Sequence, residues 1–256
     1  MLSVVNDAAT HTHLIEDHPP ATVTSAALFL PLPQKALRRN AVASLLTAIF
    51  KGQLKAGDWL NAQKLAEQFG ISATPVREAL VELAGVGIVE MQHNRGTTVR
   101  PFGPVQLQDI YRLRRVLETE AARSACGHIP VETLTTLRQE MTELLDNRKA
   151  AHWPDRAMKS DRDLHDLVAK HCGSQRLAEE IKRYNTLIQC IRDVVGNQSS
   201  AQQRALTEHL EIIEPLVKGD AQSAADAMSR HIRHTANRIE AALFPDANLK
   251  DHKSTK

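Results

Sequence analysis

The sequence predicts a mainly α-helical protein of two domains, a small N-terminal domain that ends in a β-hairpin and a larger domain built only of helices. Aromatic residues make up 4% of the 256 residues and apolar residues 42%. Alternating runs of β-branched residues are scarce, whereas apolar residues recur every three or four positions along most of the chain, which is typical of helices. The length suits two domains, and the apolar fraction is enough to fill their cores.

Proline and glycine residues mark the expected boundaries. The pairs Arg100-Pro101 and Gly103-Pro104 separate the two domains, and glycine or proline breaks divide the second domain into short helices. The first residues are rich in proline and lack helical periodicity, and the last ones are polar. We therefore expect a disordered N-terminal arm, the hairpin-containing domain, the helical domain and a flexible tail, over residues 1–33, 34–103, 104–245 and 246–256. The helices expected in the larger domain span 106–126, 131–149, 155–171, 174–195, 199–218 and 221–242.

The charge is unevenly distributed along the chain. The net charge of +2 argues against a polycationic coat protein. Residues 35–100, however, carry nine Lys or Arg and five Asp or Glu, while residues 1–34 carry no Lys or Arg. A basic segment in the smaller domain is what binding to nucleic acid requires.

The three cysteines, Cys126, Cys172 and Cys190, are odd in number and far apart. This pattern favours reduced thiols over a disulfide framework. No apolar run reaches the length of a membrane span, and the N-terminus lacks a signal pattern. We expect a soluble cytoplasmic protein with no membrane partner.

Residues 64–100 predict two helices joined by a tight turn and followed by a hairpin. Gly70 ends the first helix, Ser72 suits the N-cap of the second, and Pro75 falls in the first turn, where no N–H is needed. Residues 88–91 and 97–100 are the expected strands. This order is that of a winged helix-turn-helix, which places its second helix in the major groove of DNA.

The candidate DNA contacts lie at the start of that helix and at the hairpin tip. Ser72 and Thr74 can meet phosphates at the helix N-terminus, and Arg77 is long enough to reach a phosphate or a guanine edge. Arg95 and Gly96 can approach the minor groove or the backbone. A single Thr or Arg on a helix surface is usually only solvated, so the prediction depends on the cap, turn and hairpin together.

Asp161 and His165 are four residues apart, and His209 and His231 lie on later helices. A carboxylate and three neutral imidazoles suit Zn²⁺, Ni²⁺ or Mn²⁺. The chain has twelve histidines, so chance pairs are expected, and an Asp/His pair at this spacing is more often a surface hydrogen bond.

The run from Phe69 to Leu80 resembles that of the GntR family of bacterial transcription regulators, Phe-Gly-Val-Ser-Arg-Thr-Pro-Val-Arg-Glu-Ala-Leu, and the tip at residues 94–96 matches as well. The chain departs from the family at Ala73, where the usual residue is an Arg that touches the operator. Gln63 also stands where related regulators carry an Arg. Loss of a guanine contact removes roughly 1–3 kcal/mol of discrimination. Either the target sequence differs from that of relatives, or Gln63 and Lys64 compensate.

Residues 104–244 resemble the all-helical effector domain of the FCD (FadR C-terminal domain) branch of that family. The matching features are Leu113–Glu118, Asp161 with His165, Glu208-His209, Gly219-Asp220 and Met228 with His231-Ile232. Family members with the full Asp/His/His/His set bind a metal inside the helical bundle, and members without it accommodate acyl chains. The resemblance implies a divalent metal ion held by Asp161, His165, His209 and His231.

The resemblance also implies that Arg114 pairs with the carboxylate of a small organic acid that touches the metal. Arg114 lies in a pattern, Leu113, Val116 and Leu117, that we expect to be buried. The alternative is an ion pair with Glu118 or Glu120. His234, one turn past His231, is a second candidate for effector contact.

The sequence therefore predicts a homodimeric, ligand-responsive transcription regulator whose two winged modules bind double-stranded operator DNA. The resemblance favours a repressor of a catabolic operon that senses a small carboxylate. We expect no enzyme, because no catalytic motif is present and no nucleophile is paired with a general base. The alternatives are a metal-dependent hydrolase, in which the metal activates water, and a metal-stabilised DNA-binding protein without effector.

Overall fold

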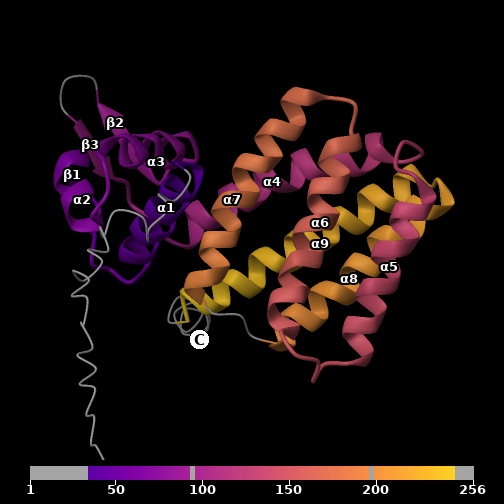
Figure 1. Ribbon diagram of the computed structural model, residues 1–256. Helices are drawn as coiled ribbons and strands as arrows, with labels where there is room; N and C mark the ends of the chain where they lie inside the picture. Colours follow the sequence, from indigo (N-terminus) through magenta and orange to yellow (C-terminus); the bar gives the residue numbers. More distant parts are fainter. Residues whose placement is uncertain (1–33, 93–95, 196–198, 246–256) are drawn as a thin grey trace, which may run out of the picture. The chain divides into compact units, whose positions relative to one another are not determined.

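The computed structural model describes residues 34–92, 96–195 and 199–245 (Figure 1). The expected arm at residues 1–33 and the tail at 246–256 lie outside these ranges. Within them the chain is mainly helical with one small sheet, so the predicted fold class is confirmed.

The N-terminal domain packs three helices beside a three-stranded antiparallel sheet of order β1-β3-β2. Val89 pairs with Val99 and Gln92 with Gly96, so β2 and β3 form the predicted wing hairpin. The short strand β1 pairs with the other edge of β3 and was not predicted. The elements are α1 Gln34–Phe50, β1 Trp59–Leu60, α2 Ala62–Phe69, α3 Ala73–Gly85, β2 Val89–Gln92 and β3 Gly96–Val99.

The turn between α2 and α3 is set by its capping residues. The Asn61 side chain accepts hydrogen bonds from the backbone N–H groups of Gln63 and Lys64 at the start of α2. Gly70 ends that helix in the left-handed region, with φ of 65°. Ser72 occupies the N-cap position of α3 as predicted, but its side chain makes no capping hydrogen bond.

The C-terminal domain is a bundle in which α4 runs along α9, α8 packs on α9 and α5, and α6 contacts α4 and α8 (Figure 1). Its helices match the predicted ones, with ends that differ by at most three residues. They are α4 Pro104–Ala125, α5 Val131–Asp146, α6 Trp153–His171, α7 Gln175–Val195, α8 Ser199–Lys218 and α9 Ala221–Leu243. None of the helices within the described residues is long and apolar enough to cross a membrane.

The prediction that Leu113 and Val116 are buried in α4 is wrong, because these side chains are 45% and 58% exposed. The inward face of α4 instead carries Tyr111, Arg114 and Glu118. The two charged residues tolerate burial because they form an ion pair with each other. Three alanines follow on the same face, where small side chains let a neighbouring helix approach closely.

The wing offers a test of the backbone geometry. Gly96 has φ of +97°, and a Cβ there would lie 3.1 Å from the Trp59 ring. We expect Gly96→Ala to lower the free energy of unfolding by about 1–3 kcal/mol, because both the left-handed backbone and the contact are unfavourable for alanine. Urea denaturation followed by circular dichroism measures it.

Gly85→Ala is the matched control. Gly85 ends α3 without positive φ, and the nearest atom to an added Cβ is 3.8 Å away. The same chemical change there should leave stability unchanged or raise it by up to about 1 kcal/mol. Equal losses in both variants would show that the wing geometry is not the cause.

Candidate metal centre and nucleic-acid interface

Four predicted metal ligands come together in the C-terminal domain. Asp161 and His165 project from α6, His209 from α8 and His231 from α9. One ligand atom from each lies within 4.8 Å of all the others, and the four residues are buried. His209 Nε2 is 3.2 Å from His231 Nε2 and 3.3 Å from Asp161 Oδ1. Asp161 and His165 are therefore buried, and the alternative that they form a chance hydrogen bond at the surface is wrong.

Two glutamates orient the histidine rings. The Nδ1 of His165 hydrogen-bonds Glu118, which comes from α4, and the Nδ1 of His231 lies 2.8 Å from Glu208 Oε2. A neutral ring that donates from Nδ1 has its lone pair on Nε2, so both rings turn that atom to the centre. Carboxylates in this position are typical of the outer shell of metal sites.

Two atoms at the centre make no hydrogen bond with the protein, Asp161 Oδ1 and His165 Nε2. Buried polar atoms without a partner are costly, and native structures contain few of them. A bound cation would satisfy both atoms at once. The donor set of one carboxylate and three imidazole nitrogens thus fits the divalent metal that the sequence implies.

The charges at the centre also fit a metal. Burial lowers the pKa of His209 well below its usual value. Burial also lowers the pKa of His231, to about 4, although the hydrogen bond with Glu208 raises it. Burial raises the pKa of Asp161, but Arg192 and the histidines outweigh it and hold this pKa well below its usual value. Near neutral pH His209 and His231 are therefore neutral and Asp161 is a carboxylate, which are the metal-binding forms.

Two arginines fix the carboxylates around the centre. Arg192 on α7 donates from Nη1 to Asp161 Oδ2, which leaves Oδ1 facing the histidines. Arg238 binds both oxygens of Glu208, at 2.7 and 2.8 Å. The predicted contact residue His234 also bonds Glu208, at 3.0 Å. His234 is thus placed behind the His231 ring, not among the ligand atoms.

Arg114 adopts the alternative considered from the sequence. It is buried and pairs with Glu118, while Glu120 pairs with Arg123. Glu118 thus joins Arg114 to the His165 ring. Burial raises the pKa of Glu118, but Arg114 and His165 outweigh this effect and lower the pKa to about 2. Arg114 is not among the residues that line the cavity described next.

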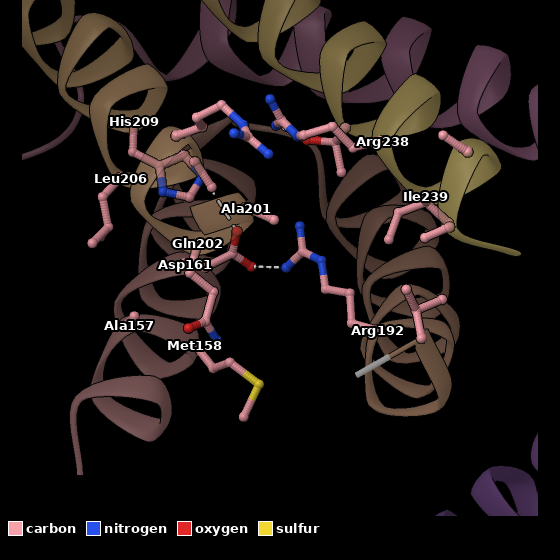
Figure 2. A pocket seen from close by; sticks show the side chains of 16 residues that line it. Ala157, Met158, Asp161, Arg192, Ala201, Gln202, Leu206, His209, Arg238 and Ile239 are labelled. Atoms are coloured by element: carbon pink, nitrogen blue, oxygen red, sulfur yellow. Dashed lines mark hydrogen bonds and ion pairs between the residues drawn. The ribbon is translucent and has the colours of Figure 1, made fainter. Parts of the chain in front are cut away.

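A cavity of about 370 Å³ adjoins the centre (Figure 2). Asp161 and His209 line it together with Arg192, whose side chain extends across the cavity towards the Asp161 carboxylate. Most of the remaining wall comes from α8 and α9 and is apolar. A cavity of this size beside charged groups suits a small ligand.

The predicted DNA contacts lie on the surface of the N-terminal domain. Ser72, Thr74 and Arg77 are exposed at the start of α3, Gln63 and Lys64 are exposed on α2, and Gly96 is exposed where β3 begins. Arg95 lies outside the described residues. Val81, which was not among the predicted contacts, is 57% exposed and follows Arg77 by one turn on α3. An apolar side chain on a recognition helix can contact a thymine methyl group.

Sequence reasoning missed Glu208 and Arg192 as partners of the cluster, and it named Glu118 as a partner of Arg114 but not of His165. Glu208 precedes His209 directly, but no spacing rule assigns it to the His231 ring, 23 residues away. Arg192 lies 31 residues from Asp161 and on another helix. The spacing of four residues between Arg114 and Glu118 on a helix indicates their ion pair, but it gives no indication of the bond to His165.

Comparisons with known families cover both domains. The model described as "Bacterial regulatory proteins, gntR family" matches residues 37–99, and that of the FCD domain matches residues 109–234. The solved structure of Escherichia coli McbR/YncC shares the fold, with a TM-score of 0.57 and 21% identity over 79% of this chain and 96% of that one.

Curated relatives carry regulator names. The HTH-type transcriptional repressor RspR of Escherichia coli is 24% identical over 205 residues, which are 79% of this chain and 85% of the relative. A probable D-xylose utilization operon transcriptional repressor of Paenarthrobacter nicotinovorans is 28% identical over 227 residues, 82% of this chain and 96% of the relative. With both domains matched, this chain belongs to the GntR family of DNA-binding transcription regulators, in the branch with an FCD domain.

Proposed function

We propose that the protein is a homodimeric repressor that binds operator DNA and responds to a small organic acid through a metal-containing C-terminal domain. The observation that carries the proposal is the buried cluster of one carboxylate and three imidazoles beside a cavity. It lies in a chain whose first domain belongs to a DNA-binding family. The repressor names of two relatives support repression.

The exposed start of α3 is the surface that we propose to enter the major groove. Thr74 lies beside the helix N-terminus, whose N–H groups and dipole favour phosphate, and Arg77 lies one turn further along. Arg77 can bind a phosphate or guanine O6 and N7, and Val81 follows on the same face. Because Ala73 replaces an operator-contacting Arg of the family, specificity depends more on these neighbours.

We expect Arg77→Ala to weaken operator binding at least tenfold, because it removes a charge-assisted contact to DNA. The probe is a genomic fragment selected by the unmodified protein, and the measurement is a gel shift at fixed ionic strength. Arg162→Ala is the control, since it removes an equal charge from an exposed position on α6. Equal affinity of the Arg77 variant and the unmodified protein would contradict the proposed orientation of α3.

We propose that Asp161, His165, His209 and His231 hold one divalent ion, Zn²⁺, Ni²⁺ or Mn²⁺. When bound, the ion supplies a positive charge that attracts an anionic effector and links α6, α8 and α9. Glu118 and Glu208 hold the imidazole rings of His165 and His231 in the orientation that presents Nε2. Their role is to position the ligands.

We expect Glu208→Gln to lower metal affinity about 10–100-fold, because an amide holds the His231 ring less firmly than a carboxylate. Competition with a chromophoric chelator measures the affinity. Glu211→Gln, an exposed change on the same helix, should leave it unaltered. Retention of full affinity in Glu208→Gln would argue against a metal held through His231.

Homodimerisation is supported by the outer face of α4. Val105, Leu113 and Val116 are exposed there, on one side of the helix. Residues of opposite charge lie at equal distances before and after Val116. Arg112 precedes it by four positions and Glu120 follows it by four, while Asp109 precedes it by seven and Arg123 follows it by seven. Two copies crossing antiparallel at Val116 would pair each Arg112 with Glu120 of the partner subunit. A two-fold interface requires this self-complementarity, so we propose a second copy as the occupant of this face.

Charge reversal tests the proposed pairing. We expect Arg112→Glu to weaken the dimer roughly tenfold, because it faces the partner's Glu120 with a like charge. The double variant Arg112→Glu/Glu120→Arg should restore it, since the two positions are too far apart on one helix to compensate within a chain. Sedimentation velocity measures the dimer, with Arg162→Glu as control. A double variant that stays as weak as the single one would contradict the antiparallel crossing.

A further inference from the structure

We infer that the cavity beside the centre takes a carboxylic acid with an apolar body, and that it discriminates against hydroxylated sugar acids. The inference rests on the effector role proposed above and names the class of the effector. It follows from how charge and apolar surface are divided along the cavity wall.

The charged end of the cavity is formed by Arg192 beside Asp161 and His209 (Figure 2). The Arg192 side chain is 14% exposed, and its Nη1 donates to Asp161. A guanidinium has five N–H groups in a planar fork, which can serve a second carboxylate beside the first. Because Asp161 and Arg192 neutralise each other, an anion from solvent is not repelled there.

Most of the rest of the wall is apolar. Met158, Val195, Leu206 and Ile239 line it together with five alanines. Hydroxyl groups held against such side chains lose their hydrogen bonds to water and gain none, whereas methylene groups gain from leaving water. The alanines keep the wall wide without adding polar contacts. The shape and chemistry therefore favour an aliphatic or aromatic body behind the carboxylate.

The polar residues of the wall leave few groups for a ligand. The Arg238 guanidinium is held by both oxygens of Glu208 and by Thr235. Gln202 has a buried Oε1 without a hydrogen-bond partner, so the wall can accept one donor from a ligand. Arg204 is exposed. One free acceptor can serve a single hydroxyl but not the five of a six-carbon sugar acid.

Isothermal titration of the full-length protein, with its metal content measured, tests the inference. The ligands are hexanoate, octanoate, gluconate and hexanamide. Gluconate matches hexanoate in chain length and charge but carries five hydroxyls, and hexanamide matches it in length without the charge. We expect octanoate to bind more tightly than hexanoate, and gluconate and hexanamide to bind at least tenfold more weakly than hexanoate.

Two variants connect these differences to the two ends of the cavity. Arg192→Gln should abolish the preference for hexanoate over hexanamide, while Arg192→Lys should retain part of it. Arg176→Gln, an exposed change on the same helix, is the control. Ala205→Phe reduces the space for the body, so it should remove the gain from hexanoate to octanoate. Metal content and circular dichroism show whether each variant keeps its fold.

Several results would overturn the inference. Gluconate binding as tightly as hexanoate would show that the wall does not select against hydroxyls. Tighter binding of adipate than of hexanoate would place a second carboxylate at Arg204. If neither hexanoate nor octanoate binds while the metal content and the gel shift are intact, the ligand class is wrong and the regulator function stands. Absence of operator binding with octanoate binding intact would refute the proposed function alone.

Discussion

The C-terminal domain depends on the need to satisfy charged and polar groups that are buried together. Asp161 and three histidines meet where α6, α8 and α9 approach one another, and burial of an unpaired carboxylate is among the costliest events in folding. Each of these four residues except His209 therefore has a charged partner outside the cluster: Arg192 for Asp161, Glu118 for His165 and Glu208 for His231. These partners come from α7, α4 and α8, so the cluster ties together five helices of the bundle.

This constraint explains why the inward face of α4 carries two charged residues that hydrophobic periodicity does not predict. Leu113 and Val116 look like core residues in sequence, yet Arg114 and Glu118 occupy the inward positions. The ion pair and the bond from His165 to Glu118 make burial of charge acceptable. Apolar residues are left on the outside, where a second copy of the chain can cover them. Periodicity alone carries no information on which polar residues find a buried partner.

Local signals were sufficient for most of the fold. Gly70, Pro75 and the glycine and proline breaks of the C-terminal domain gave helix ends within three residues, because capping and steric limits act over a few positions. The four clustered positions could be named from the spacing of Asp161 and His165 and from the resemblance to the FCD branch. The partners Glu208 and Arg192 could not, because their roles depend on the packing of separate helices. The strand β1 was not predicted either, because a strand of two residues is too short to show an alternating pattern.

The hydrogen bond from His165 to Glu118 attaches the buried cluster to α4, the helix that leads to the chain's other domain. The wing strand β3 ends at Val99 and α4 begins at Pro104, so a tether of four residues joins the domain that binds DNA to this helix. Glu118 lies fourteen residues along it, about 21 Å at the rise of an α-helix. A helix transmits displacement along its axis with little loss. A rearrangement of the hydrogen bond between His165 and Glu118 would therefore act on a stiff helix whose first turn is joined to the winged module.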